Sequence, residues 1–290
     1  MVRVVTDSNA HLSVPLREKY KIGFVPLQFL FGTRAFRDEV DMSNEQFFHM
    51  LKHEKVHPTT SAPAPADFIQ VWKPLLEAGE EVVSVCLPSG LSATYSSAVN
   101  AKAQMEQEHG APLPITVVDG KWLSMAQGFQ CLEGARVAMA GGSSQDVVKA
   151  LTALDERISL VFLLDTLEYL KRGGRIGKAQ AWLGTMFNVK PILEIAHARV
   201  EPLERVRSRK AGLTRLLELV QTPPLTNGPR KGEGALHIAV LHARAPEAAQ
   251  QLEDELRARF NIAEIVRAEI GPTIAVHTGP DALGLAFYRD

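Results

Sequence analysis

The 290-residue chain has few cysteines, few aromatic residues and no long apolar run. It holds two cysteines, Cys86 and Cys131, and no C-x-x-C pair, which excludes a disulfide framework and favours a reducing compartment. No apolar stretch approaches the roughly 18 residues of a membrane-spanning helix, and the start, MVRVVTDSNA, lacks the apolar core of a signal peptide. We therefore expect a cytoplasmic protein without a transmembrane segment.

A large charge imbalance and the common catalytic motifs are also missing. Lys and Arg total 32 against 33 Asp and Glu, so nothing in the net charge favours nucleic acid as a partner. The sequence has no G-x-S-x-G, no H-E-x-x-H and no metal-spaced Cys/His cluster. A phosphate loop is excluded because Arg172 and Ala179 stand where that motif needs Gly and Ser or Thr. We expect no catalytic residue, no metal and no cofactor.

What the chain does have is an apolar content of 46%, which suits a large core, and a regular alternation of strand and helix patterns. Short apolar runs read as buried strands and alternate with amphipathic stretches, which predicts a mostly parallel sheet covered by helices. The expected strands are 2–5, 22–31, 81–88 and 114–119. The expected helices are 12–21, with Ser13 as N-cap, 43–52, with Ser43 as N-cap, 66–78, 94–110 and 121–142.

The second half of the sequence has a less regular pattern. A helix over 146–158 and a strand over 159–165 precede short extended pieces at 190–207, which favour antiparallel pairing. Residues 222–234 have the composition of a surface loop, and 264–290 are expected to end the chain in strands. We place a domain boundary near residue 155.

Polar stretches follow three of the expected elements, and ligands of open α/β sheets bind beyond the carboxyl ends of strands. The first stretch, Thr6-Asp7-Ser8, is equally consistent with simple turn chemistry. In the second, HPTTSAPAPADF at 57–68, Pro63 and Pro65 restrict the backbone. That stiffness pre-positions Thr60 and Ser61 and favours a ligand loop over a flexible linker.

The third stretch, PSGLSATYSSA at 88–98, follows a strand and opens a helix. A hydroxyl-rich helix N-terminus offers free backbone N–H groups and side-chain donors to an anion. Simple N-capping by Ser92 or Thr94 is the alternative, and it needs only one hydroxyl. The stretch carries five, at Ser89, Ser92, Thr94, Ser96 and Ser97, so their excess favours a ligand.

Three further features lie in the second half. His277 is expected at a strand end beside Thr278, where a structural histidine is the commoner reading. The basic, glycine-rich turn KRGGRIGK at 171–178 is either a solvated turn or a surface that docks a partner. Arg205, Arg207 and Arg209 lie two positions apart, which is typical of a solvated face on an extended segment.

Several of these stretches together resemble the signatures of the DegV family of fatty-acid-binding proteins. VVTDSNAHL resembles TDSxxDL, PTTSAPAP resembles PTTSQPSP, and LPSGLSATYSSA resembles SSxLSGTYQSA. LEYLKRGGRIGKA, VRSRKA and HTGPDALGL resemble later signatures in the same order. The matches cover nearly the whole chain. The chain departs from the family pattern at His11, Ala62, Ala64, Ala93 and Asp281.

The resemblance implies an α/β fold of two domains. Residues 1–154 would form a Rossmann-like three-layer domain with a mostly parallel sheet, and 155–290 a smaller α/β domain with a mixed sheet. One long-chain fatty acid, such as palmitate or oleate, would lie between or beneath them. The resemblance also implies a carrier rather than an enzyme. In several bacteria such proteins are the acyl-binding subunit of a fatty acid kinase, whose separate ATP-binding subunit makes acyl phosphate for phospholipid synthesis.

The resemblance further implies which residues bind the carboxylate. The family's head-group residues carry over onto Thr60, Ser92 and His277, with Arg207 as a further candidate, and the neighbouring hydroxyls of Ser61 and Thr94 join the same expected site. The basic turn, through Lys171, Arg172 and Arg175, is expected to dock the kinase subunit.

Two other functions remain open from the sequence. Ser92 with His277 as its base would suit a hydrolase or transferase. A lipid sensor without any kinase partner would need the same binding site and no phosphorylation.

Overall fold

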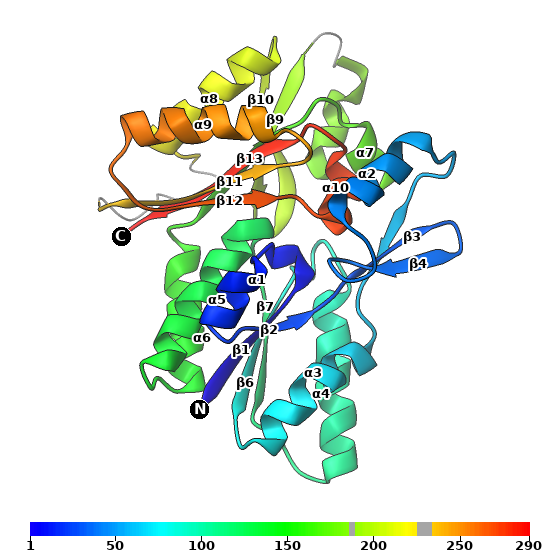
Figure 1. Ribbon diagram of the computed structural model, residues 1–290, viewed down its shortest axis with the longest axis vertical. Coiled ribbons are helices and arrows are strands. Elements are labelled where there is room, and N and C mark those ends of the chain that lie inside the picture. The colour runs from blue at the N-terminus through cyan, green and yellow to red at the C-terminus, as the bar shows by residue number, and fades with distance from the viewer. Residues whose placement is uncertain (186–188, 225–233) are drawn as a thin grey trace.

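A computed structural model describes residues 1–185, 189–224 and 234–290. Figure 1 shows two stacked parts, with a parallel sheet and its helices below and a second sheet with two long helices above. The surface loop predicted over 222–234 lies mostly outside the described residues, which leave out 225–233.

The lower part is a four-stranded sheet in which all neighbouring strands are parallel. Helices cover both of its faces, with α3 and α4 on one side and α5 and α6 on the other (Figure 1). The valine-rich strands are therefore buried from both sides. The strand order is β2-β1-β6-β7, at Gly23–Val25, Val2–Asp7, Glu81–Cys86 and Ile115–Asp119. The helices are α1 (Val14–Lys19), α3 (Pro65–Glu77), α4 (Thr94–His109), α5 (Ser124–Met139) and α6 (Ser144–Asp155). This confirms the expected three-layer arrangement.

A small antiparallel sheet, not predicted from the sequence, extends from the lower part. Its strand order is β4-β3-β5, at Arg34–Arg37, Gln28–Phe31 and Thr59–Ser61. The predicted strand at 22–31 is divided between two sheets because Pro26 separates β2 from β3. Helix α2 (Asn44–His53) lies between β4 and β5 in the chain, and Ser43 caps it as predicted: its Oγ accepts the Gln46 N–H at 3.2 Å. Ser13, the expected N-cap of α1, makes no such side-chain hydrogen bond.

The second half forms a mixed six-stranded sheet. Its order is β10-β9-β8-β13-β11-β12, and β11 pairs with β12 in parallel while the other neighbours are antiparallel. The strands are β8 (Ser159–Leu163), β9 (Lys190–Ala196), β10 (Arg199–Val206), β11 (Leu236–His242), β12 (Ile262–Glu269) and β13 (Leu283–Arg289). Helices α8 (Arg209–Gln221) and α9 (Pro246–Arg259) lie along it (Figure 1).

Four short helical segments complete the part of the fold that the structure describes. Two 3₁₀ segments, η1 and η2, span Ser8–Ala10 and Gly177–Thr185, and helix α7 spans Glu168–Arg172. The last, α10 (Pro272–Thr278), interrupts the stretch that the sequence analysis predicted as strands up to residue 290. This prediction was wrong between β12 and β13, and the difference matters because α10 carries His277.

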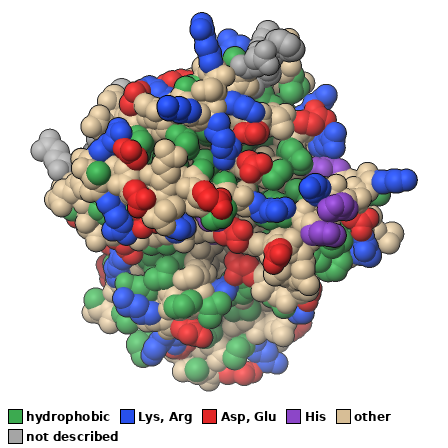
Figure 2. Space-filling model, turned by 45° about the horizontal axis from the view of Figure 1, so that its top comes forward, with side chains coloured by type: hydrophobic (Ala, Val, Ile, Leu, Met, Phe, Trp, Pro, Cys, Tyr) green, Lys and Arg blue, Asp and Glu red, His purple; other side chains and the backbone are tan. Residues whose placement is uncertain are grey.

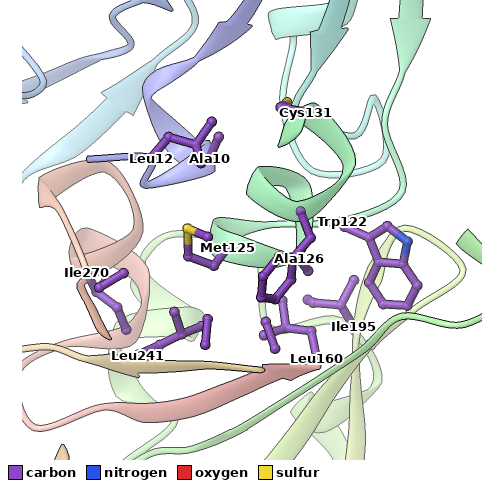
Figure 3. Close-up of a cluster of buried hydrophobic side chains, with 14 of the residues drawn as sticks. Ala10, Leu12, Trp122, Met125, Ala126, Cys131, Leu160, Ile195, Leu241 and Ile270 are labelled. Carbon is purple, nitrogen blue, oxygen red and sulfur yellow. The ribbon is translucent and has the colours of Figure 1, made fainter. Parts of the chain in front are cut away.

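One hydrophobic core joins the two sheets. In Figure 3, Met125 and Ala126 of α5 lie opposite Leu160 and Leu241 of the mixed sheet, and all four are buried. Helix α6 ends at Asp155, close to the expected boundary, but the shared core packs the two halves tightly. The division at residue 155 stays a prediction.

The visible surface carries mixed charge. In Figure 2, Lys and Arg side chains alternate with Asp and Glu side chains over the face that is shown, in line with the net charge of −1.

Among the described helices, none is long and apolar enough to cross a membrane. Cys86 and Cys131 are buried free thiols, and burial raises the pKa of Cys131 to about 12.

Candidate functional site

A cavity of about 350 Å³ lies at the carboxyl ends of β1 and β6, where the strand order of the parallel sheet reverses. Such switch points are the usual ligand sites of open α/β sheets. Asn9 follows β1 and Leu87 follows β6, and both line the cavity. Both halves of the chain supply its mainly apolar wall, through Leu27, Leu87, Leu91, Leu123, Phe162, Leu170, Val200 and Ile274.

Buried Asp7 holds the two strand ends together at this point. One of its carboxylate oxygens accepts the Leu87 N–H at 2.7 Å, and the other accepts the Asn9 N–H at 3.1 Å. Burial raises the pKa of Asp7 to about 7, against the lowering effect of these N–H groups. The Thr6-Asp7-Ser8 stretch thus performs turn chemistry, and its neighbour Asn9 is the residue that reaches the cavity.

Thr60 and His277 meet on the cavity wall. Thr60 lies on β5 and pairs with Phe29 of β3, whereas His277 lies in the last turn of α10 and not at a strand end as expected. Their side chains form a hydrogen bond of 2.9 Å between Oγ1 and Nε2. The other ring nitrogen, Nδ1, is buried and has no partner among the described residues.

A glycine makes room for the His277 ring. A Cβ atom added at Gly173 would stand 2.0 Å from His277 Nδ1, so a larger residue there would displace the ring. Burial lowers the pKa of His277 to about 4, with further lowering by the charges of Arg175 and His57. The imidazole is therefore neutral at pH 7 and has one donor and one acceptor nitrogen.

Ser92 also lines the cavity, in the loop that precedes α4. Its N–H donates to the Pro88 carbonyl, and its Oγ lies 2.8 Å from Thr94 Oγ1. Thr94 is fully buried and is not among the lining residues, so it orients Ser92 rather than facing a ligand.

The other hydroxyls of the 88–98 stretch have structural partners. Ser89 bonds Asp119, Ser96 bonds the Ala93 carbonyl, and Ser97 donates to the Pro63 carbonyl at 2.6 Å. The excess of hydroxyls, read as a sign of a ligand, is thus largely explained by hydrogen bonds within the protein. The bond from Ser97 has a further consequence, since it fastens the Thr60 loop to α4.

Arg175 lines the cavity as well as lying at the outer surface. Its Nε donates to the Leu91 carbonyl at 3.2 Å and its Nη1 to the Gly173 carbonyl at 2.7 Å, so it connects the basic turn to the Ser92 loop. Sequence reasoning assigned Arg175 to partner docking, because nothing in the sequence places it beside Leu91. Lys171 and Arg172 are exposed in the last helical turn of α7, so the expected basic turn begins as helix.

The remaining expected site residues are less central. Ser61 lines the cavity, although its Oγ lies 3.2 Å from the Ala62 carbonyl. Arg207 is exposed just beyond β10 and is not among the lining residues, so the structure does not bring it to Thr60 and His277.

The departures from the family pattern fit the local structure. Ala62 and Ala93 line the cavity, where small side chains leave space, and Ala64 precedes the first residue of α3. Asp281, at a position where glycine is usual, has φ of 64°, a left-handed conformation that aspartate tolerates better than most residues. His11, where aspartate is usual, also has positive φ, at 50°.

A shallower groove adjoins the cavity. It has a volume of about 630 Å³ and shares Leu91, Ser92, Ala93, Arg175 and Val200 with the cavity. Its other lining residues include Ser89, Gly90, Ser96, Gly174, Gly177 and Arg199. Ser92 and Arg175 therefore stand at the passage between the apolar cavity and an open, more polar surface.

The geometry does not favour a serine nucleophile. A nucleophilic serine needs a base within hydrogen-bond reach, and that base is in turn oriented by a third group. Here Ser92 Oγ bonds Thr94, His277 Nε2 bonds Thr60, and Nδ1 has no partner among the described residues. Nor do three or more His, Cys, Asp or Glu side chains of the described residues come together in a way that suits a metal ion.

Comparison with known proteins identifies the family. A family model described as an uncharacterised protein of the DegV family matches residues 1–290. The chain belongs to the DegV family. A DegV domain-containing protein of Streptomyces coelicolor is 38% identical over 287 residues, which cover 98% of this chain and 97% of the relative.

Solved structures share the fold. A fatty-acid-binding DegV family protein from Thermus thermophilus matches with a TM-score of 0.89 and 31% identity, covering 100% of this chain and 99% of that one. A stearic-acid-binding protein from Eubacterium ventriosum matches with a TM-score of 0.88 and 27% identity, covering 100% and 98%. These matches confirm the predicted family and the two-sheet α/β fold.

Proposed function

We propose that this chain binds one long-chain fatty acid, such as palmitate or oleate, with the acyl chain in the cavity and the carboxylate at Thr60, Ser92 and His277. The observation that carries the proposal is the Thr60–His277 bond of 2.9 Å on the wall of a mainly apolar cavity. The fatty acids bound by the T. thermophilus and E. ventriosum relatives support the ligand class.

The energetics suit such a ligand. Burying a sixteen-carbon tail gains about 10 kcal/mol at roughly 0.8 kcal/mol per CH₂, and association and ordering costs remove several of these. A buried carboxylate must find donors, since an unpaired charge would cancel much of that gain. The Ser92 hydroxyl supplies one donor and the Thr60–His277 pair another, because one of the two protons of the neutral pair stays in the bond between these side chains.

We further propose that the protein presents the carboxylate to a separate ATP-dependent kinase. A carboxylate oxygen would attack the terminal phosphorus of ATP held by that kinase, giving acyl phosphate and ADP. Two observations support this: the sequence has no phosphate loop of its own, and the groove beside Ser92 and Arg175 gives access to the carboxylate end. The exposed side chains of Lys171 and Arg172, at the end of α7, would dock the kinase.

A titration of the delipidated protein with palmitate and with its methyl ester tests the binding proposal. The acid should bind tightly and the ester more weakly, because an uncharged ester forms weaker hydrogen bonds with the donors than a carboxylate does. Equal affinity for acid and ester would contradict the head-group assignment. If the ester were instead hydrolysed, and the activity required both Ser92 and His277, the hydrolase function would replace the carrier function.

A further inference from the structure

Helix α10 is attached to the small antiparallel sheet at both of its ends. At its C-terminal end, His277 bonds Thr60 of β5. At its N-terminal end, Thr273 Oγ1 donates to Asp38 Oδ2 at 2.6 Å, and Asp38 in turn donates its N–H to the Leu27 carbonyl, directly before β3. The helix is therefore bonded to β5 at its last turn and, at its start, to the residue that follows β4.

Asp38 is an unusual residue for this place. It is fully buried, and Ser8 Oγ donates to the same Oδ2 at 2.8 Å, while Oδ1 is buried without a partner among the described residues. Burial raises the pKa of Asp38, whereas hydrogen bonds from Thr273, Ser8 and the Glu39 backbone lower it. An apolar residue at this position would leave the buried Ser8 and Thr273 hydroxyls without this acceptor.

His11 holds the residue before α10. Its Nε2 accepts the Gly271 N–H at 3.1 Å, so the ring proton is on Nδ1, which donates to Ser124 Oγ at 2.8 Å. Burial lowers the pKa of His11 to about 4, which keeps the ring in this neutral form. Gly271 is closely surrounded, since an added Cβ would stand 3.2 Å from Asp38 Oδ1 and 3.5 Å from His11 Nε2.

We propose that His11 and Asp38, bonded to Gly271 and Thr273, are positioning residues that set where His277 stands relative to Thr60. We call these four residues the α10 clamp. The helix has seven residues and spans only about 10 Å, so a displacement at its start is carried to its last turn. The inference rests on the proposed function, because the clamp affects fatty acid affinity only if the fatty acid binds beside His277.

Thr273→Val is the variant that separates positioning from contact. Thr273 also lines the cavity, so if it acted through contact alone, a methyl group in place of the hydroxyl would leave palmitate affinity unchanged or strengthen it. Loss of the clamp bond should instead weaken palmitate binding by about three- to tenfold. In the ligand-free protein, the ¹⁵N chemical shift of His277 Nε2 should change. The change should have the same direction as in Thr60→Val, which removes the hydrogen-bond partner of that nitrogen.

Matched variants complete the test. Thr273→Ser keeps the hydroxyl and should restore both the signal and the affinity. Thr152→Val, the same substitution on α6 where the hydroxyl bonds the Val148 carbonyl, should change neither. If Thr273→Val fails to fold, His11→Asn replaces it: asparagine tolerates the positive φ but is too short to reach the Gly271 N–H.

An unchanged His277 signal in a folded Thr273→Val or His11→Asn variant would overturn the clamp. The signal is read without ligand, so this failure is distinct from a failure of the proposed function. If the signal moved and even the wild type did not bind palmitate, the clamp would stand and the fatty acid site would be withdrawn.

Discussion

Thr60 Oγ1 and His277 Nε2 lie 2.9 Å apart, although 217 positions separate the two residues in the sequence. One is on an edge strand of a small sheet and the other at the end of a short helix, and each is placed by different neighbours. Their meeting on the wall of an apolar cavity marks the candidate site.

The first prediction concerns the hydroxyl donors. Thr60→Ala and Ser92→Ala should each weaken palmitate binding by about 1–3 kcal/mol, because each removes one donor from a buried charged acceptor. Displacement of a fluorescent fatty acid measures the change. Thr59→Ala and Thr214→Ala are matched controls, since both residues are exposed and line neither the cavity nor the adjoining groove. Equal losses in controls and site variants would point to a general effect on folding.

The second prediction concerns protonation of His277. Its pKa is lowered to about 4 in the free protein, and a bound carboxylate would favour the charged ring and raise that pKa. Binding should then take up a fraction of a proton, and affinity should rise as pH falls from 7 to 6, where a carboxyl with an ordinary pKa of about 4 stays ionised.

Calorimetry in buffers of different ionisation enthalpy measures this uptake. His277→Gln, which does not titrate, should abolish it, whereas His57→Gln should leave it in place and thereby exclude the neighbouring histidine as its source. Binding heats that are independent of the buffer in the wild type would argue against His277 as a carboxylate neighbour.

The third prediction concerns Gly173. Gly173→Ala should displace the His277 ring, since the new Cβ would collide with Nδ1, and should weaken fatty acid binding by about tenfold or more. The backbone at Gly173 has φ of −76°, so alanine brings no strain of its own. Gly184→Ala is the control, because nothing lies within 4 Å of its added Cβ. Wild-type affinity in Gly173→Ala would show that the ring position is unimportant.

The fourth prediction separates docking from binding. Lys171→Glu with Arg172→Glu should reduce acyl phosphate formation by a cognate kinase at physiological salt and leave palmitate affinity unchanged. Arg175 is left intact because it lines the cavity. The control, Arg257→Glu with Arg259→Glu on α9, also reverses two charges, and Arg259, like Arg172, is ion-paired to a glutamate four residues earlier. Equal phosphorylation in both double variants would remove the docking role.

Much of the fold was predictable because local patterns and tertiary structure agree. The buried valine strands, the Ser43 cap and the left-handed Gly110 that ends α4 all follow from short-range rules. Helix α10 does not. Thr273, Ile274 and Val276 are β-branched and favour a strand, and the Gly271-Pro272 pair reads as a turn. Its helical form comes with contacts from His11 and Asp38, which are more than 230 positions away.

The residues of the candidate site were named through the family resemblance, and their role stays a prediction; their arrangement could not be predicted from the sequence. Thr60, Ser92 and His277 were named, yet no spacing in the sequence indicates that Thr60 and His277 touch. Arg175 was assigned to an outer surface because its proximity to Leu91 arises from packing between the two halves. Arg207 was named from a signature, and the fold leaves it exposed and outside the cavity lining.

The central claim is that one fatty acid occupies the cavity between the two sheets. Native mass spectrometry of the freshly purified protein tests it most directly. We expect a bound species heavier than the chain by the mass of one long-chain fatty acid, lost in the Thr60→Ala and Ser92→Ala double variant. A wild-type protein that is found empty, and shows no thermal shift with added palmitate or oleate, would contradict the account.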